Sequence, residues 1–85
     1  MKTYLIIYTS NNTQSIVDRI KTFKYYIRIK YRVWCISTDI NSASEVRNIF
    51  KDIQEIELLM VIDISQSSWA AINLSPDSVF WLKER

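Results

Sequence analysis

The residues with the clearest chemical potential lie in a basic segment, residues 19–38, that contains no acid. Six cations are spread along the basic segment, and five aromatic residues lie among them. Cations that contact phosphates, beside rings that stack on bases, are a common means of holding nucleic acid. The cations are Arg19, Lys21, Lys24, Arg28, Lys30 and Arg32, and the rings are Phe23, Tyr25, Tyr26, Tyr31 and Trp34.

Three of these cations, Arg28, Lys30 and Arg32, alternate with other residues. On a strand they would form one row along one side, which a phosphate backbone could follow. Tyr31 is the candidate stacking ring. The alternative interpretation is an edge strand kept soluble by its charge, with the rings serving the core. The cations that we expect to help from outside the row are Arg19 and Lys24.

Other residues that carry chemistry are sparse. The chain has no His, no Gly and one Cys, which excludes His-based or thiolate zinc sites, His general bases and Gly-rich phosphate loops. Asp39 and Asp63 follow predicted strands, and we interpret them as solvated strand ends rather than as a magnesium pair. Cys35 lacks a basic partner in an apolar strand, which predicts a buried, inert thiol. We therefore expect no cofactor and no bound metal.

The elements that must position these residues follow from the spacing of apolar side chains. Residues 2–9 and 58–64 are nearly continuous apolar runs, typical of strands buried on both faces. Residues 25–38 change to a period of two, which predicts two strands that meet tightly near residues 30–32. One long bent strand is the alternative, because no Gly or Asn is present there to adopt a positive φ.

Three helices are predicted between and after these strands, each from its capping residues. Asn12 or Thr13 caps the first helix, and Ser42 and Glu45 form a capping box for the second. Ser75 followed by Pro and Asp starts a short third helix through residues 79–83.

This order of elements predicts an α+β fold in a single domain, residues 1–85. We expect a ferredoxin-like βαββαβ sandwich, in which a four-stranded antiparallel sheet carries two helices on one face, plus a short C-terminal helix. We place the two apolar strands, residues 2–9 and 58–64, at the centre of the sheet and the charged strands at its edges.

Charge and composition bear on partners and location. The net charge is +2, but the charges are unevenly distributed. Residues 39–63 carry six acids and two bases, so an acidic segment follows the basic segment along the chain. The longest apolar runs are too short to span a bilayer. One Cys allows no internal disulfide, and no signal peptide is recognisable, so we expect a cytoplasmic protein without a membrane association.

Five stretches, MKTYLIIY, VWCISTD, SASEVRNIFKDI, ELLMVIDIS and FWLKER, resemble the SinR-like proteins, small relatives of the CRISPR-associated Cas-two endoribonuclease and spacer-integration subunit. The resemblance runs nearly end to end. It implies a ferredoxin-like fold, a homodimer and an association with nucleic acid. In the Cas-two family the first strand ends in an aromatic residue followed by an Asp, the proposed metal ligand. Here Thr9 follows Tyr8, and a neutral hydroxyl is a poor sole ligand for magnesium.

We therefore expect a catalytically inactive, Cas-two-like homodimer that binds DNA or RNA, or a protein partner, through its basic edge. Two alternatives stay open. One is a metal-dependent endoribonuclease of Cas-two type that uses Asp63 or Asp39. The other is an interaction module, such as a toxin–antitoxin component or a phage accessory factor, whose exposed strand pairs with a partner.

Overall fold

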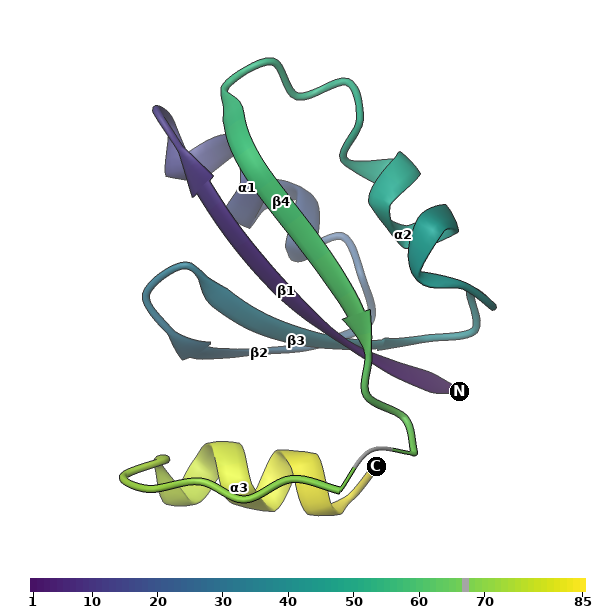
Figure 1. Ribbon diagram of the computed structural model, residues 1–85, viewed down its shortest axis with the longest axis vertical. Coiled ribbons are helices and arrows are strands. Elements are labelled where there is room, and N and C mark those ends of the chain that lie inside the picture. The colour runs from purple at the N-terminus through teal and green to yellow at the C-terminus, as the bar shows by residue number, and fades with distance from the viewer. Residues whose placement is uncertain (67) are drawn as a thin grey trace.

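The computed structural model describes residues 1–66 and 68–85, and these form an α+β fold with a four-stranded antiparallel sheet and three helices (Figure 1). None of the helices in the described ranges is long and apolar enough to cross a membrane. In chain order the elements are β1 (Lys2–Ser10), α1 (Thr13–Ile20), β2 (Tyr25–Lys30), β3 (Val33–Thr38), α2 (Ala43–Ile49), β4 (Ile56–Asp63) and α3 (Pro76–Lys83).

All three helices begin at the residues that the capping pattern predicts. The Asn12 side chain accepts a hydrogen bond from the backbone N–H of Gln14 at 3.1 Å, which starts α1. The Ser42 hydroxyl accepts one from the Glu45 N–H at 3.2 Å, which starts α2. Ser75 caps α3 in the same way. The predicted helix starts are confirmed because a side-chain oxygen satisfies an amide that the first turn leaves free.

β2 and β3 are joined by a two-residue turn, Tyr31 and Arg32, so the prediction of two strands is confirmed over one bent strand. Arg32 adopts the positive φ, 66°, that a Gly or Asn would adopt more easily. Its carbonyl accepts a hydrogen bond from the Tyr8 N–H at 3.2 Å, which ties the turn to β1. A left-handed backbone at a residue with a long side chain costs roughly 1–2 kcal/mol.

The prediction that β1 and β4 are the central pair is wrong. The strand order is β2-β3-β1-β4, so β1 and β3 are central and β4 forms an edge. β4 is apolar on both of its faces although it has a neighbouring strand on one side only. Leu59 and Val61 pack against the core, whereas Leu58, Met60 and Ile62 alternate with them and are 39–50% exposed on the other face.

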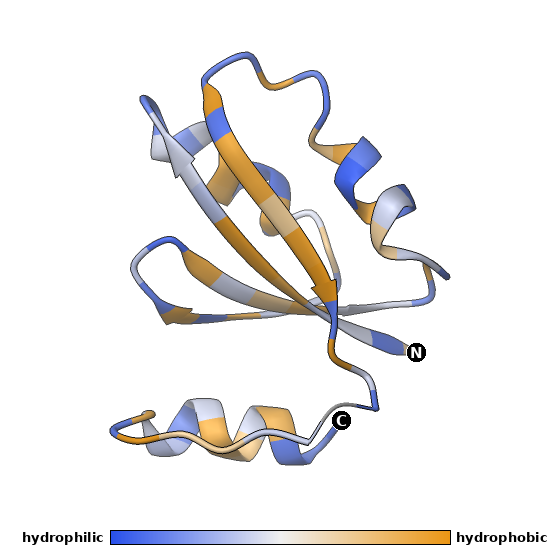
Figure 2. Ribbon diagram, in the orientation of Figure 1, coloured by the Kyte–Doolittle hydropathy of each residue, from blue (hydrophilic) through white to orange (hydrophobic). Residues whose placement is uncertain are grey.

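The core lies between the sheet and the two helices α1 and α2, which cover one face (Figure 1). Figure 2 shows that most of β4 and part of β1 are apolar along the strand, whereas α2 alternates between apolar and polar residues. The predicted apolar stripes of the helices meet the inward side chains of β1 and β3. The buried core residues are Tyr4, Ile6, Tyr8, Ile16, Ile20, Trp34, Ile36, Val46 and Phe50.

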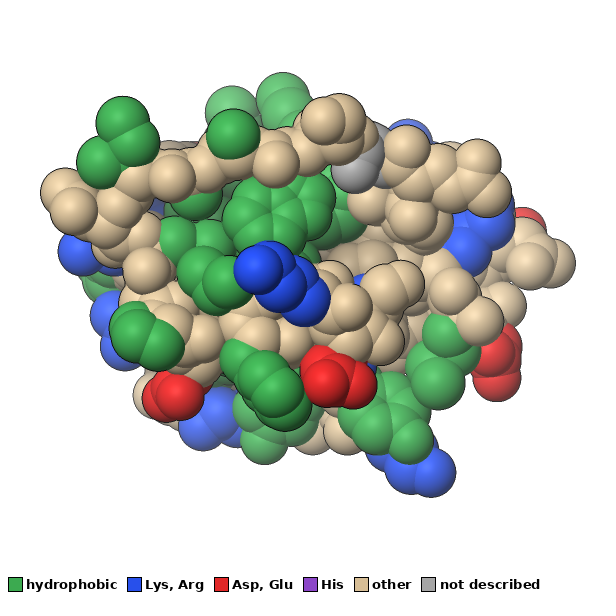
Figure 3. All heavy atoms as spheres, turned by 90° about the horizontal axis from the view of Figure 1, so that it is seen from below, with side chains coloured by type: hydrophobic (Ala, Val, Ile, Leu, Met, Phe, Trp, Pro, Cys, Tyr) green, Lys and Arg blue, Asp and Glu red, His purple; other side chains and the backbone are tan. Residues whose placement is uncertain are grey.

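α3 packs against β2 on the opposite side of the sheet from α1 (Figure 1). Arg85, just after α3, lies 4.0 Å from the Trp81 ring centre and 5.4 Å from that of Tyr25 on β2. This cation therefore joins the end of the chain to the sheet. Seen from below, the same side carries hydrophobic side chains around a hollow (Figure 3). In the C-terminal part of the chain, Phe80 on α3 is 67% exposed and Ile72 is 91% exposed.

Candidate nucleic-acid interface

A basic cavity lies where the β2–β3 hairpin meets α1 and the end of β1, and we call it the hairpin pocket. Its volume is about 410 Å³. Its lining includes three cations and three aromatic rings but no acid. The lining residues are Tyr8, Thr13, Gln14, Val17, Lys21, Arg28, Tyr31, Arg32 and Trp34. A concave site lined by positive charges attracts anions, because its low-dielectric walls concentrate the electric field.

The turn supplies the pocket with a paired cation and ring. The Arg32 guanidinium carbon lies 4.8 Å from the centre of the Tyr31 ring. Hydrogen bonding from Arg32, and secondarily from Thr13, lowers the pKa of the Tyr31 phenol. The charge of Arg28 acts in the same direction. The phenol oxygen therefore already experiences the positive field that an incoming anion would meet.

Two hydrogen-bond donors of the hairpin pocket have no partner among the described residues. They are the indole Nε1–H of Trp34, a residue only 6% exposed, and the Nε–H of Arg32. An unmet buried donor costs about 1–3 kcal/mol. Both groups can only donate, so a ligand that satisfies them must bring acceptor oxygens or nitrogens.

Three of the predicted nucleic-acid residues, Arg28, Tyr31 and Arg32, meet in the hairpin pocket. Lys30 is not among its lining residues, and the predicted unbroken row of three cations is wrong. The pairing register shifts between Arg28 and Lys30, so Arg28 pairs with Trp34 but Lys30 pairs with Val33. Cross-strand partners share a face, and adjacent residues of β3 point to opposite faces. The bulge therefore turns Lys30 away from the face that carries Arg28.

The two predicted outer helpers have structural contacts of their own. Arg19 donates hydrogen bonds to both carboxylate oxygens of Asp52, at 2.8 and 3.0 Å, and also to the Ile49 carbonyl. This contact joins α1 to the segment after α2 and lowers the pKa of Asp52. Lys24 lies 5.4 Å from the centre of the Tyr25 ring. Their contribution to nucleic-acid binding stays a prediction.

Lys21, Thr13 and Gln14 line the pocket but are not among the predicted site residues, and Trp34 was predicted only as one of the five rings of the basic segment. Their signal was helical spacing. Thr13, Val17 and Lys21 are four residues apart, which places them on one face of α1. Sequence alone does not tell that this face meets the hairpin, because that contact depends on how α1 crosses the sheet.

The acids proposed for a nuclease lie far along β1 from Thr9. Thr9 pairs with Leu58 near the end of β1, whereas Asp63 pairs with Tyr4 and Asp39 follows the partner of Lys2, near its start. Hydrogen bonds from the Ser65 hydroxyl at 2.6 Å and its N–H at 3.0 Å lower the pKa of Asp63, and Lys2 adds to this. Within residues 1–66 and 68–85, no three metal-binding side chains gather in one place.

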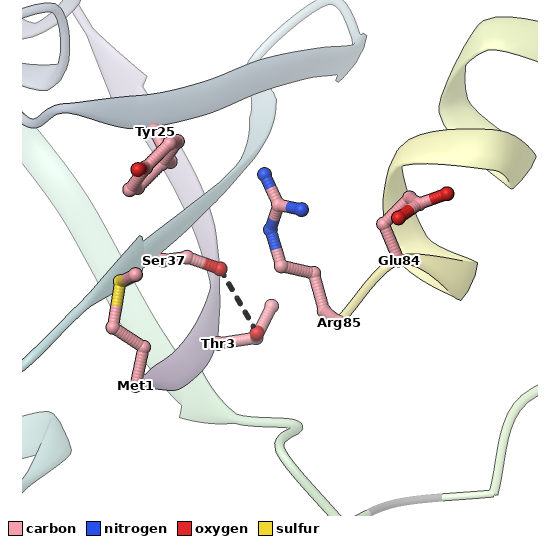
Figure 4. Close-up of a pocket in the computed structure, with 6 residues that line it drawn as sticks. All are labelled: Met1, Thr3, Tyr25, Ser37, Glu84 and Arg85. Atoms are coloured by element: carbon pink, nitrogen blue, oxygen red, sulfur yellow. Dashed lines mark hydrogen bonds between the residues drawn. The ribbon is translucent and has the colours of Figure 1, made fainter.

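A second cavity, about 370 Å³, lies between α3 and the sheet (Figure 4). Figure 4 shows the Arg85 side chain reaching into this cavity from the end of the chain, toward Tyr25 and Ser37. At its wall the hydroxyls of Thr3 and Ser37 share a buried hydrogen bond of 3.1 Å. Because Arg85 stacks on the rings here, we interpret this cavity as part of the packing of α3.

The single cysteine, Cys35, is 1% exposed in β3, as predicted. Burial raises the pKa of its thiol to about 12. The reactive thiolate is therefore scarce at neutral pH, and we assign the side chain to packing.

Comparison of the chain with protein-family models, with curated proteins and with solved structures gives no match.

Proposed function

We propose that this chain binds single-stranded nucleic acid through the hairpin pocket and the adjoining basic edge. The observation that carries the proposal is the convergence of Lys21, Arg28 and Arg32 around exposed Tyr31, with no acid in the lining. Cations neutralise phosphates, and an exposed ring offers a platform for an unpaired base. Lys30, the last residue of β2, adds a cation beside the turn but on the other face of the strand.

We further propose that the chain is a ferredoxin-like, Cas-two-like protein that lacks nuclease activity. The helix between β1 and β2, the helix between β3 and β4, and the strand order β2-β3-β1-β4 support a ferredoxin-like arrangement. Thr9 at the end of β1 supports the inactive assignment, because a hydroxyl replaces the carboxylate. Asp63 was the alternative candidate for a metal ligand, and its carboxylate already accepts hydrogen bonds from Ser65 and Lys2.

A homodimer forms the third part of this proposal. β4 is an edge strand whose outward face, Leu58, Met60 and Ile62, is about half exposed. On that face their register partners on β1 include the apolar Leu5 and Ile7. An apolar strand at an open edge invites association unless something covers it. We propose that a second copy of the chain covers this face, which lies away from the hairpin pocket.

The test of nucleic-acid binding is a titration with short single-stranded and double-stranded DNA and RNA at low and at physiological salt. We expect binding to weaken steeply with salt. A variant with Arg28→Ala, Lys30→Ala and Arg32→Gly should bind all sequences more weakly, and its slope of log K against log salt should be smaller by about 2. Gly is used at position 32 because φ there is 66°.

The matched control removes three cations elsewhere, with Arg47→Ala, Lys51→Ala and Lys83→Ala on α2, after it and on α3. It changes the net charge by the same amount and should bind nearly as the unmodified protein does. Equal losses in both variants would mean that only net charge matters. No binding at low salt would sink the proposal and favour a protein partner at the open β4 edge. RNA cleavage that needs magnesium and is lost on Asp63→Asn or Asp39→Asn would overturn the inactive assignment.

A further inference from the structure

We propose that the hairpin pocket binds the phosphorylated end of a single-stranded nucleic acid, with the terminal phosphomonoester inside and the adjoining base on Tyr31. This inference rests on the proposed function and names which part of the nucleic acid the pocket selects. It concerns a chain end, whereas the basic edge contacts the internal phosphates.

The charge of the pocket favours a terminal over an internal phosphate. Lys21, Arg28 and Arg32 bring three positive charges to one cavity, and no lining side chain is acidic. An internal phosphodiester carries one negative charge. A phosphomonoester carries nearly two at neutral pH and offers three acceptor oxygens. Three convergent cations therefore match the end group better, and arginine binds it through two parallel hydrogen bonds.

The unmet donors point to the same ligand. The Trp34 indole N–H and the Arg32 Nε–H have no partner among the described residues. Both can only donate, so the group that meets them must accept. A phosphomonoester can accept from both donors through different oxygens. A base edge, which mixes donors and acceptors, satisfies them less well.

The pocket has a buried floor and an exposed rim. Tyr8, 1% exposed, and Trp34, 6% exposed, are its buried lining residues, so a strand cannot run through at that depth. The unmet nitrogens each expose less than 1 Å². A phosphate oxygen therefore reaches them only when a rim side chain turns aside. Tyr31, 58% exposed in the turn, is the rim side chain to which we assign this movement.

The experiment compares one short oligonucleotide with a 5′-phosphate, with a 3′-phosphate and with hydroxyls at both ends, using fluorescence anisotropy. We expect one phosphorylated form to bind at least about tenfold more tightly than the unphosphorylated form. This preference should grow as pH rises from about 5 to about 7, because the second pKa of a phosphomonoester is near 6. The chain has no His to titrate in that interval.

Two variants test the assigned residues. Trp34→Phe keeps a buried ring but removes the indole N–H, and Lys21→Gln removes a cation from an exposed position. Each should weaken binding of the phosphorylated oligonucleotide by a larger factor than binding of the unphosphorylated one, so that the preference for the phosphorylated end falls. Trp81→Phe and Lys51→Gln are the matched controls and should keep the preference. If Trp34→Phe fails to fold, Lys21→Gln alone still tests whether the pocket prefers the phosphorylated end.

An NMR measurement distinguishes a direct contact between Trp34 and the ligand from a role of Trp34 in packing. The indole N–H resonance of Trp34, identified by its loss in Trp34→Phe, should shift when the phosphorylated oligonucleotide binds and should not shift with the unphosphorylated one. A hydrogen bond to phosphate produces this shift, whereas simple packing of the ring does not.

The outcomes distinguish this inference from the proposed function. Equal binding of phosphorylated and unphosphorylated oligonucleotides would leave nucleic-acid binding in place and overturn the end pocket. No binding of any oligonucleotide would overturn both. Adenosine monophosphate is the probe for a free nucleotide: if it binds in the pocket while no oligonucleotide does, the ligand is the nucleotide and not a chain end.

Discussion

At the scale of single residues, the unusual position is Arg32. A residue with a long side chain adopts φ of 66° in a turn whose strands could be joined more easily by Gly or Asn. The same residue lines the hairpin pocket, lies against Tyr31 and buries an unmet Nε–H. Strained backbone of this kind is found often at functional sites. We therefore interpret the strained backbone at position 32 as the cost of placing an arginine side chain in the pocket.

This interpretation predicts an inverted order of stability at position 32. Arg32→Gly and Arg32→Ala both remove the side chain, so their difference reports the backbone. The Gly variant should be more stable than the Ala variant by about 1 kcal/mol, because Ala pays the left-handed strain. Urea unfolding measures both.

The matched pair is Lys30→Gly and Lys30→Ala, on β2 two residues earlier. There the order should be the ordinary one, with Ala more stable by about 0.5–1 kcal/mol. The same order at both positions would contradict the left-handed turn.

A second prediction at this scale concerns Asp63 and acid. The hydrogen bonds from Ser65, and then the Lys2 ammonium, hold the pKa of Asp63 below its ordinary value, which is about 3.9 in unfolded chains. The ionised group therefore stabilises the fold above about pH 4, and this stabilisation is lost as pH falls through the folded pKa. Asp63→Asn should be less stable than the unmodified protein near neutral pH, and the difference should shrink below about pH 4.

Urea unfolding near neutral pH and again near about pH 2.5 measures this difference. Asp39→Asn removes the same charge from a residue that makes none of the side-chain hydrogen bonds found among the described residues. Its effect should be small at both pH values. A loss in Asp63→Asn that is as large in acid as at neutral pH would assign the residue a packing role.

At the scale of elements, the helices are short and depend on their caps. α2 has seven residues, and the Ser42 hydroxyl satisfies the Glu45 amide in its first turn. A helix this short is not stable alone. Its position is fixed by Val46, which is fully buried, and by Phe50 just beyond its end.

Ser42→Ala should therefore lower the free energy of unfolding by about 1 kcal/mol, because the first turn loses its cap. Asn41→Ala, one residue earlier and exposed, is the control and should change stability by less than about 0.5 kcal/mol. Thermal or urea unfolding by circular dichroism measures both. Equal effects would show that the Ser42 hydroxyl is not the stabilising group.

The bulge in β2 belongs to this scale too. It separates Lys30 from Arg28 and leaves Arg28, Tyr31 and Arg32 to form the pocket with α1. One extra residue in a strand changes which face its later side chains occupy. Two cations that are two residues apart therefore serve different surfaces.

At the scale of the whole molecule, the sheet has one face covered by α1 and α2 and another covered only in part by α3. The uncovered part lies over β1 and β4, where Leu58, Met60 and Ile62 are 39–50% exposed. The hairpin pocket lies on the helix side of the sheet. The proposed nucleic-acid site and the proposed dimer face therefore lie on opposite sides of the sheet.

If the proposed homodimer forms through this face, Met60→Glu should give a monomer. A charge in the middle of the apolar face costs far more in an interface than in water. Sedimentation velocity over a range of concentrations measures the change. Phe80→Glu, on α3 and 67% exposed, is the control and should leave the dimer intact.

If the unmodified chain is already a monomer at high concentration, the homodimer is wrong. The open face would then be available for a different protein partner. If both variants dissociate the dimer, the interface includes α3.

The helices and strands of this protein could be predicted from its amino-acid sequence. Helix starts at Asn12, Ser42 and Ser75, the two strands around residues 30–32 and the buried Cys35 all follow from local patterns, because caps, turns and alternation act over a few residues. The sequence also brought out Arg28, Tyr31 and Arg32 as candidate site residues, since their types and spacing are visible in one segment.

The order of the strands and the composition of the pocket depend instead on contacts between distant segments. An apolar run such as β4 has the same sequence pattern whether it lies between two strands or at the edge of the sheet. The pattern therefore predicted the wrong position for β4. Lys21 and Trp34 join Arg28 and Arg32 only because α1 crosses the sheet beside the hairpin. That crossing, like the bulge that turns Lys30 away, is set by packing between residues distant in sequence.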